Sequence, residues 1–187
     1  MTVGVNPSGS DFLTLFSDFR HTAYRLEVRR SYGVAEEDES FQRFLKGEDP
    51  GIDWFRPWLR LMAEQTGSGK RVERVRVVDD PPSDYLQFEI VNTPHNLRAG
   101  EDIRYLRRSR AHELELPDYD YWVFDSRLLV FLRFDASDRF LGFERTDDQA
   151  EVLRHLQWRD AAWHHAVRYE DYRKTVAIDV GPTSSRV

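Results

Sequence analysis

Apolar residues in the first third of the chain recur at helical spacing. The stripe runs, at intervals of three and four residues, through Phe12, Leu15, Phe16, Phe19 and Ala23. Such intervals place side chains on one face of a helix. Alternation over residues 24–28 predicts a short strand next. Two more helices are predicted, one from the acidic run 36–39 to Gly47 and one from Asp53 to residues 67–69, so block 11–68 is mainly helical.

The middle of the chain, residues 71–146, carries the strands. A β-branched run over 72–78 predicts the first strand, and Ser83 is placed to cap a helix that ends at Gly100. Further strands are predicted at 103–106, 119–125, 128–134 and 140–144, the last three joined by turns of hairpin length. In the strand 119–125, Tyr121 and Val123 alternate with Trp122 and Phe124, so both faces are apolar and the strand is expected to be central.

A final helix is predicted from Asp147 and Asp148 to about residue 168, with Val152, Leu156 and Trp163 on its inner face. The element order is helices, then β-α-β-β-β-β, then a helix. This order predicts an α/β (α+β) fold in which N-terminal helices and a C-terminal helix pack on a mixed central sheet. Trp54 and Trp58 are expected to share a helix face and, with Trp163, to join the helical block to the final helix.

Length and composition fit one domain. A chain of 187 residues buries one sizeable core, and we assign residues 11–172 to a single globular domain. Residues 1–10 and 173–187 are polar and rich in Gly, Ser, Pro and Thr, so we predict a disordered N-terminal tail and a flexible C-terminal tail.

Charge and cysteine content exclude several function classes. The formal net charge is -6, which opposes strong direct binding to nucleic acid. There are no cysteines, so disulfides, thiolate zinc sites and cysteine nucleophiles are excluded. No apolar run has the length of a membrane span, and the N-terminus lacks the pattern of a secretory signal. We expect a cytoplasmic protein that does not associate with membranes.

The common catalytic motifs are missing. The segment Gly67-Ser68-Gly69-Lys70 resembles the end of a phosphate-binding loop, but Glu64 occupies the position of the first glycine and Arg71 that of the hydroxyl residue. The six histidines include no H-E-x-x-H pair, and the chain has no G-x-S-x-G nucleophile motif. We therefore assign no catalytic residue, no metal site and no cofactor.

The candidate binding residues gather around a local excess of arginine. The basic members are Arg98, Arg104, Arg107, Arg108 and Arg110, and the acidic residues among them are Glu101 and Asp102. They form either a solvated basic edge or a patch that binds an anionic small ligand or an acidic partner through arginine forks. The other candidates are polar residues of the same block: Asp84, Glu89, His95, Asn96, Asp125 and Arg127.

Several motifs resemble an actinobacterial domain family of unknown function. The motifs lie at residues 25–27, 54–59, 83–89, 94–96, 99–106, 122–127 and 158–163. The likeness covers residues 11–172. It implies a small cytoplasmic protein, often encoded beside a helix-turn-helix regulator, and it implies no activity.

A second resemblance concerns fold alone. The element order of residues 71–146 is similar to half of a phospholipase D-like domain. Enzymes of that superfamily use H-x-K-x-x-x-x-D, with histidine as nucleophile and lysine on the phosphate. No histidine in this chain is followed two positions later by lysine, so the resemblance implies the fold without that chemistry.

These observations leave two hypotheses. The first is a non-enzymatic regulatory or interaction module that works with a separately encoded DNA-binding protein, such as a helix-turn-helix regulator. The alternative is an enzyme or toxin directed at a phosphodiester or nucleotide. It would use the arginines for phosphate and His95, Glu89 or Glu101 as acid–base groups.

Overall fold

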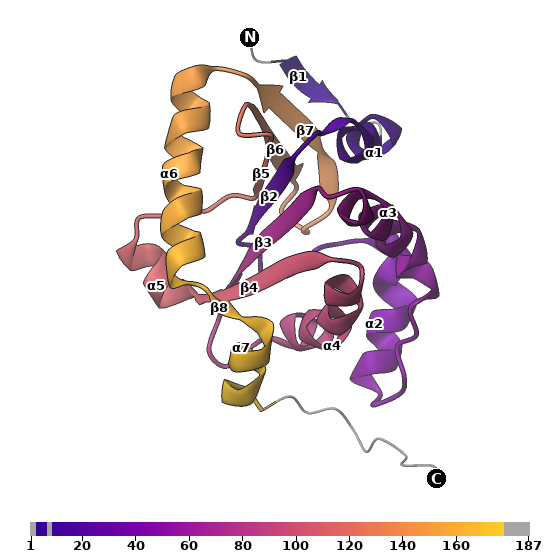
Figure 1. Cartoon of the computed structure of the whole chain (residues 1–187). Coiled ribbons are helices and arrows are strands. Elements are labelled where there is room, and N and C mark those ends of the chain that lie inside the picture. Colours follow the sequence, from indigo (N-terminus) through magenta and orange to yellow (C-terminus); the bar gives the residue numbers. More distant parts are fainter. Residues whose placement is uncertain (1–2, 7–8, 178–187) are drawn as a thin grey trace.

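The structure is a computed structural model that describes residues 3–6 and 9–177, with side chains from residue 11 onward (Figure 1). Its strands are β1 (Val3–Asn6), β2 (Thr22–Glu27), β3 (Arg71–Val78), β4 (Glu101–Arg107), β5 (Tyr121–Phe124), β6 (Leu128–Phe134), β7 (Phe140–Thr146) and β8 (Val167–Arg168). Its α-helices are α1 (Gly9–Asp18), α2 (Asp38–Leu45), α3 (Arg56–Gly67), α4 (Asp84–Arg98), α5 (Arg108–Glu113), α6 (Gln149–His165) and α7 (Tyr169–Thr175). Two 3-10 turns are η1 (Ala35–Glu37) and η2 (Asp53–Phe55).

The strands of the described residues form one mixed sheet in the order β1-β7-β6-β5-β2-β3-β4-β8. β2, β3 and β4 run parallel, and the other pairs are antiparallel. A parallel connection requires a crossover, and the helical segments between these strands provide it. The predicted mixed sheet with helices packed on it is confirmed.

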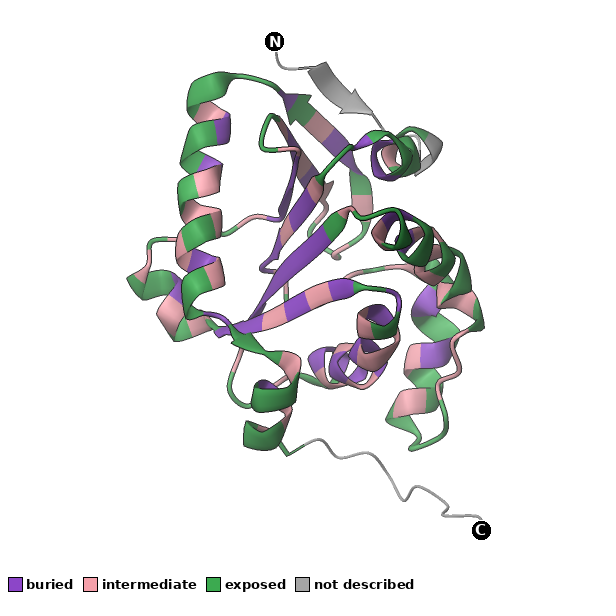
Figure 2. Ribbon diagram, in the orientation of Figure 1, coloured by how far each residue is buried: buried purple, intermediate pink, exposed green. Residues whose placement is uncertain are grey.

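Helices cover both faces of the sheet. α6 lies along one face, and α1 and α3 lie on the other (Figure 1). Alternation sends Tyr24 and Tyr121 toward α6 and sends Trp122 and Phe124 toward α1 and α3. The prediction that both faces of β5 are apolar and covered is confirmed, and Figure 2 shows β3 buried along nearly its whole length.

Local signals fix several element ends. The Ser83 hydroxyl accepts a hydrogen bond from the backbone N–H of Leu86 at 3.2 Å, which caps α4. Asp148 caps α6 in the same way, through the N–H groups of Ala150 and Glu151. The predicted helix starts at Ser83 and Asp148 are therefore confirmed.

The tryptophan prediction is wrong in its geometry. Trp58 packs on the α1 side of the sheet against Phe16, with ring centroids 4.9 Å apart. Trp163 packs on the α6 side against Tyr24, with centroids 6.4 Å apart. Trp54 belongs to η2 rather than to the helix of Trp58, and it stacks on Phe55. The sheet separates Trp58 from Trp163 because the two helices pack on opposite faces.

Four short elements differ from the predictions: β1, α5, β8 and α7. Residues 3–6, predicted as part of a disordered tail, pair antiparallel with β7, and α7 continues to Thr175, beyond the predicted domain end. Pairing at a sheet edge uses backbone groups, so it needs no apolar pattern. The rest of the two predicted tails, residues 1–2, 7–8 and 178–187, lies outside the described residues. Among the helices that the structure describes, none combines the length and apolar character needed to cross a membrane.

Candidate functional site: a basic cleft beside a buried ion network

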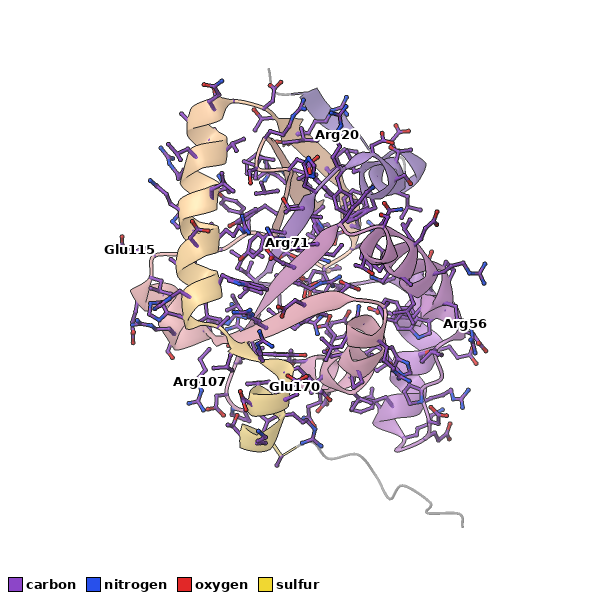
Figure 3. The ribbon with its side chains drawn as sticks, viewed as in Figure 1. Arg20, Arg56, Arg71, Arg107, Glu115 and Glu170 are labelled. Atoms are coloured by element: carbon purple, nitrogen blue, oxygen red, sulfur yellow. The ribbon has the colours of Figure 1, made fainter. Side chains whose placement is uncertain are left out.

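The predicted arginine patch is divided between two ends of the sheet. Arg107, Arg108 and Arg110 lie where β4 passes into α5, and Arg98 lies at the other end, just before β4. Glu101 pairs with Val72 and Arg107 with Val78 in the β3–β4 register. At ~3.3 Å per residue the two ends are roughly 20 Å apart. Figure 3 shows Arg71 and Arg107 well separated, so the five arginines do not form one surface.

The arginines at the α5 end are engaged in ion pairs. Arg107 contacts Asp80 at 3.2 Å, Arg108 contacts Asp79 at 2.7 Å, and Arg110 contacts Glu113 at 2.6 Å. The Arg107 and Asp80 side chains are each 59% exposed. Exposed pairs of this kind contribute little to stability. Their local pairing favours the interpretation of a solvated edge for this half of the predicted patch.

Arg98 and Arg104 line a cleft of about 640 Å³ at the start of β3 and β4. The end of α3, the α4–β4 turn and Trp163 of α6 complete its wall. Its charged lining residues, among those that the structure describes, are Lys70, Arg71, Glu73, Arg98, Asp102 and Arg104. Basic side chains therefore outnumber acidic ones in the cleft, although the chain as a whole is acidic. This cleft is the candidate functional site.

The two carboxylates of the cleft are already paired. Glu73 is 3.0 Å from Arg159 and 3.6 Å from Arg71, and Asp102 is 3.3 Å from Arg104. Arg98 instead donates to the Pro94 carbonyl at 3.1 Å. Arg71 is 66% exposed and Arg98 is also exposed, so both can turn their guanidinium groups toward an incoming anion.

One wall of the cleft is set by a close approach of two backbone segments. Gly100 has φ +88°, and a Cβ atom there would lie 2.3 Å from the Thr66 hydroxyl oxygen. The same hydroxyl donates to the Ala99 carbonyl at 2.8 Å. A side chain at position 100 would push the α4–β4 turn away from α3, so glycine keeps the wall closed.

The planar guanidinium group of Arg104 forms another wall of the cleft. The guanidinium carbon of Arg104 lies 3.7 Å from the centre of the Trp163 ring, and one guanidinium nitrogen donates to the Trp163 carbonyl at 3.4 Å. Stacking of arginine on an aromatic face is favourable and fixes the plane of the guanidinium. The sequence places these two residues 59 positions apart, so only the fold brings them together.

Beneath α3 and α4 lies a second charged group, the buried ion network. Its centre is Glu27 on β2, whose carboxylate is within 2.9 Å of Arg25 and Arg74 and within 2.8 Å of Arg76. Burial by itself would raise the pKa of Glu27, but the three guanidinium charges hold it well below the ordinary value. Glu27 therefore stays ionised in the folded protein.

Further carboxylates complete the network. Glu101 pairs with Arg74 at 2.7 Å and accepts hydrogen bonds from Trp58 Nε1 at 2.8 Å and Asn96 Nδ2 at 2.6 Å. Asp120, just before β5, pairs with Arg25 at 2.9 Å and accepts the Val28 N–H at 2.9 Å. These contacts tie β2, β3, β4 and β5 to α3 and α4 on one face of the sheet.

Two carboxyl groups at the edge of the network have raised pKa values. Burial raises the pKa of Glu89 to about 8, against the opposing charge of Arg76 at 3.0 Å and with help from Glu27 and Glu37. Burial also raises the pKa of Glu37 to about 7, although a hydrogen bond from Tyr85 opposes the shift. Both groups therefore change protonation near neutral pH.

The three groups proposed as acid–base residues do not line the cleft. Glu101 and Glu89 belong to the buried network. His95 contacts Arg98 through Nδ1 at 2.9 Å, and burial together with the Arg98 charge lowers the pKa of His95. Within the described ranges, no three His, Asp or Glu side chains are grouped so that they could hold a metal ion.

The remaining candidates have separate positions. Asp84 is exposed at the start of α4. Asp125 accepts hydrogen bonds from the N–H groups of Arg20, His21 and Thr22 at 2.7 to 3.0 Å, and these bonds lower its pKa against the effect of burial. Asp125 thus fixes the start of β2. It lines, with Arg127, a smaller hollow of about 280 Å³ near α1.

Sequence reasoning missed the cleft residues Lys70, Arg71, Glu73 and Trp163 as a group, because they come from distant segments. It also missed Arg74 and Arg76 of the network. A signal for these two was present: they alternate with Val75 and Val77 along β3, and alternation on a buried strand predicts a polar layer on one face. The valines alone led to the interpretation of a simple β-branched strand.

A family model for a domain of unknown function, DUF6879, matches residues 10–174. The chain belongs to the DUF6879 family. The predicted membership of a family without known function is therefore confirmed. No curated protein matches the DUF6879 chain.

The chain is similar to two solved structures. NucT from Helicobacter pylori superposes with a TM-score of 0.50 at 10% identity, over 85% of this chain and 89% of NucT. Phosphatidylserine synthase from Haemophilus influenzae Rd KW20 has a TM-score of 0.48 at 13% identity, over 91% of this chain and 40% of that one. The likeness to NucT confirms the predicted phospholipase D-like fold, and at this identity it concerns fold alone.

Proposed function

We propose that this DUF6879 chain is a non-catalytic interaction module that works with a separately encoded DNA-binding regulator, and that the basic cleft receives an acidic segment of that regulator. The observation that carries the proposal is the cleft itself: an excess of basic side chains, two of them exposed arginines, in a chain of net charge -6. Arginine forks bind carboxylates bidentately, which suits an acidic protein segment.

The sequence supports a non-catalytic role. It lacks the histidine–lysine pair that phospholipase D-like enzymes use. The alternative, an enzyme or toxin directed at phosphodiesters or nucleotides, would use His95, Glu89 or Glu101 as acid–base groups. These three residues do not line the cleft that carries the exposed arginines. Glu101 is held by Arg74, Trp58 and Asn96, so it cannot move to a substrate without leaving buried donors unpaired.

The net charge supports a protein partner rather than DNA itself. At physiological salt the screening length is ~8 Å, so the field of the cleft acts over a short distance. The overall charge of -6 repels a duplex at longer range. We expect the isolated chain to bind duplex DNA weakly and without base preference.

Calorimetric titration with the helix-turn-helix regulator that the family resemblance implies beside the gene tests the proposal. We expect binding that weakens as salt rises, and at least tenfold loss of affinity in the double variant Arg71→Ala/Arg98→Ala. Arg56→Ala is the matched control, since Arg56 is 61% exposed and pairs with Asp53 away from the cleft. Absence of binding, equal loss in the control, or turnover of bis-p-nitrophenyl phosphate that disappears in His95→Ala would contradict the proposal.

A further inference from the structure

The stacked pair Arg104–Trp163 gives the cleft a chemical preference beyond charge. We infer that the acidic segment it binds carries an aromatic side chain next to its carboxylates, and that this aromatic ring stacks on the guanidinium of Arg104. The inference rests on the proposed function, because it concerns the same cleft. It adds the type of side chain that the cleft selects in its partner.

The geometry of Arg104 supports this inference. One face of its guanidinium is covered by the Trp163 ring at 3.7 Å. The side chain is 18% exposed and it lines the cleft. Asp102 at 3.3 Å and the Trp163 carbonyl at 3.4 Å hold the plane of the group. A ring that enters the cleft can therefore extend an existing aromatic–guanidinium stack at little cost in side-chain entropy.

The arrangement of the cations suits carboxylates that are spread along a segment. Lys70 is committed, since its ammonium contacts the Gln65 side chain and lies 4.6 Å from the centre of the Phe19 ring. Arg71 is the first residue of β3, close to the end of α3, and Arg98 is the last residue of α4. Two single carboxylates, one for each exposed arginine, match these positions on two different elements of the cleft lining.

A compact phosphate group fits the cleft less well. α3 and α4 both end there, at Gly67 and Arg98. The C-terminal end of a helix carries partial negative charge. Glu73 and Asp102 add carboxylates that are already paired with Arg159, Arg71 and Arg104. A compact dianion places its whole charge against this negative potential, whereas an acidic segment divides its charge into single carboxylates, one for each exposed arginine.

Fluorescence anisotropy with labelled synthetic peptides tests the inference. The probes are a pentapeptide of tyrosine flanked on each side by two glutamates and the same peptide with alanine in place of tyrosine. An exposed cation–aromatic contact is worth roughly a three- to fivefold change in affinity. We expect the tyrosine peptide to bind about that much more tightly, and Arg71→Ala to weaken both peptides equally.

Arg104→Lys separates stacking from charge, because lysine keeps the positive charge but lacks the planar guanidinium group on which a ring can stack. We expect it to abolish the difference between the two peptides while the alanine peptide binds as before, with melting temperature used to verify folding. Equal affinity of the two peptides for the unmodified protein would overturn the aromatic inference and leave the proposed function standing. Failure of both peptides would overturn both. Tighter binding of adenosine monophosphate than of the tyrosine peptide would identify a nucleotide site instead.

Discussion

Arginines in two regions of the molecule have opposite surroundings. At the junction of β4 and α5, Arg107 is 59% exposed and pairs with a single equally exposed aspartate. In the middle of the sheet, Arg74 and Arg76 are 8% and 6% exposed and share the carboxylate of Glu27. The first group is replaceable because water solvates either partner alone. The second is not, since removal of one partner leaves buried charge without compensation.

The buried group also shows how a polar layer can exist inside a core. Hydrophobic clusters lie on either side of it, one around Phe16 and Trp122 and the other around Ile90 and Tyr105. The ion network fills the space between them with arginines and carboxylates that pair with one another. Such networks contribute more to a unique arrangement than to net stability.

The largest effect is expected at the centre of the network. Glu27→Ala removes the carboxylate that Arg25, Arg74 and Arg76 share, and breaking a buried pair typically costs about 3–5 kcal/mol. We expect a loss of that size in the free energy of unfolding, measured by urea denaturation, or insoluble protein. The matched control Glu113→Ala removes the carboxylate that pairs with Arg110 at the surface and should change stability by less than ~0.5 kcal/mol. A Glu27→Ala protein as stable as the control would show that the network contributes nothing.

Tryptophan truncation is expected to come next. Trp58 is half-buried against Phe16 and Trp122, and Trp163 against Tyr24 and Arg104. Each change to alanine should cost about 3 kcal/mol, the lower end of the range for large aromatic residues, because both are partly exposed.

Trp58→Phe separates packing from hydrogen bonding. It keeps most of the ring contacts and removes the bond from Nε1 to Glu101, and we expect it to cost ~1–2 kcal/mol. Thermal melting of the four proteins, including wild type, gives the ranking. A Trp58→Phe protein less stable than Trp58→Ala would contradict this account.

A pH dependence of intermediate size is expected from Glu89. Its folded pKa of about 8 lies above the ordinary value of 4.5, so the folded state keeps a proton that the unfolded state has lost between these values. The stability that this group contributes is therefore fully present below pH 4.5 and is lost as pH rises through about 8. Glu37, with a pKa of about 7, acts in the same direction.

Melting curves at about pH 6 and about pH 9 measure this effect. We expect the wild-type melting temperature to fall by on the order of 5 °C over this interval, and the fall to be at most half as large in Glu89→Gln, which mimics the protonated acid. Glu144→Gln is the control, since the hydrogen bond from Arg133 lowers the pKa of Glu144 and keeps it ionised throughout. Equal pH dependence in wild type and Glu89→Gln would refute the assignment.

The smallest effect is expected at the arginines of the β4–α5 junction, the exposed Arg107 and the partly buried Arg108. Arg107→Ala and Arg108→Ala should each change the free energy of unfolding by about 0.5 kcal/mol or less, Arg108 being the larger because it also donates to the Val77 carbonyl. Binding of the acidic probe peptides should remain unchanged, since both residues lie at the far end of β4 from the cleft. Unfolding of either variant would show that this end of the sheet depends on its ion pairs.

The main elements could be predicted because their signals are local. The strands at β3, β6 and β7, the Ser83 and Asp148 caps and the two apolar faces of β5 follow from alternation, capping chemistry and turn length. The short elements β1, β8, α5 and α7 could not, because a few residues carry too little periodicity and their pairing partners are remote in the chain. For the candidate site, the sequence showed the excess of arginine. It did not show that these arginines are divided between the two ends of β4.

By itself, the sequence determined the fold class, the absence of cysteine chemistry, the missing histidine–lysine pair and the acidic net charge, all of which depend on residue type and spacing along the chain. Only the tertiary structure decided which charges are neighbours. Parallel pairing of β2 and β3 places Glu27 opposite Arg76, and packing of α6 brings Trp163 to Arg104. Burial then determines whether water can solvate the two charges when their contact is broken. Burial in turn depends on the helices that other parts of the chain pack over the pair.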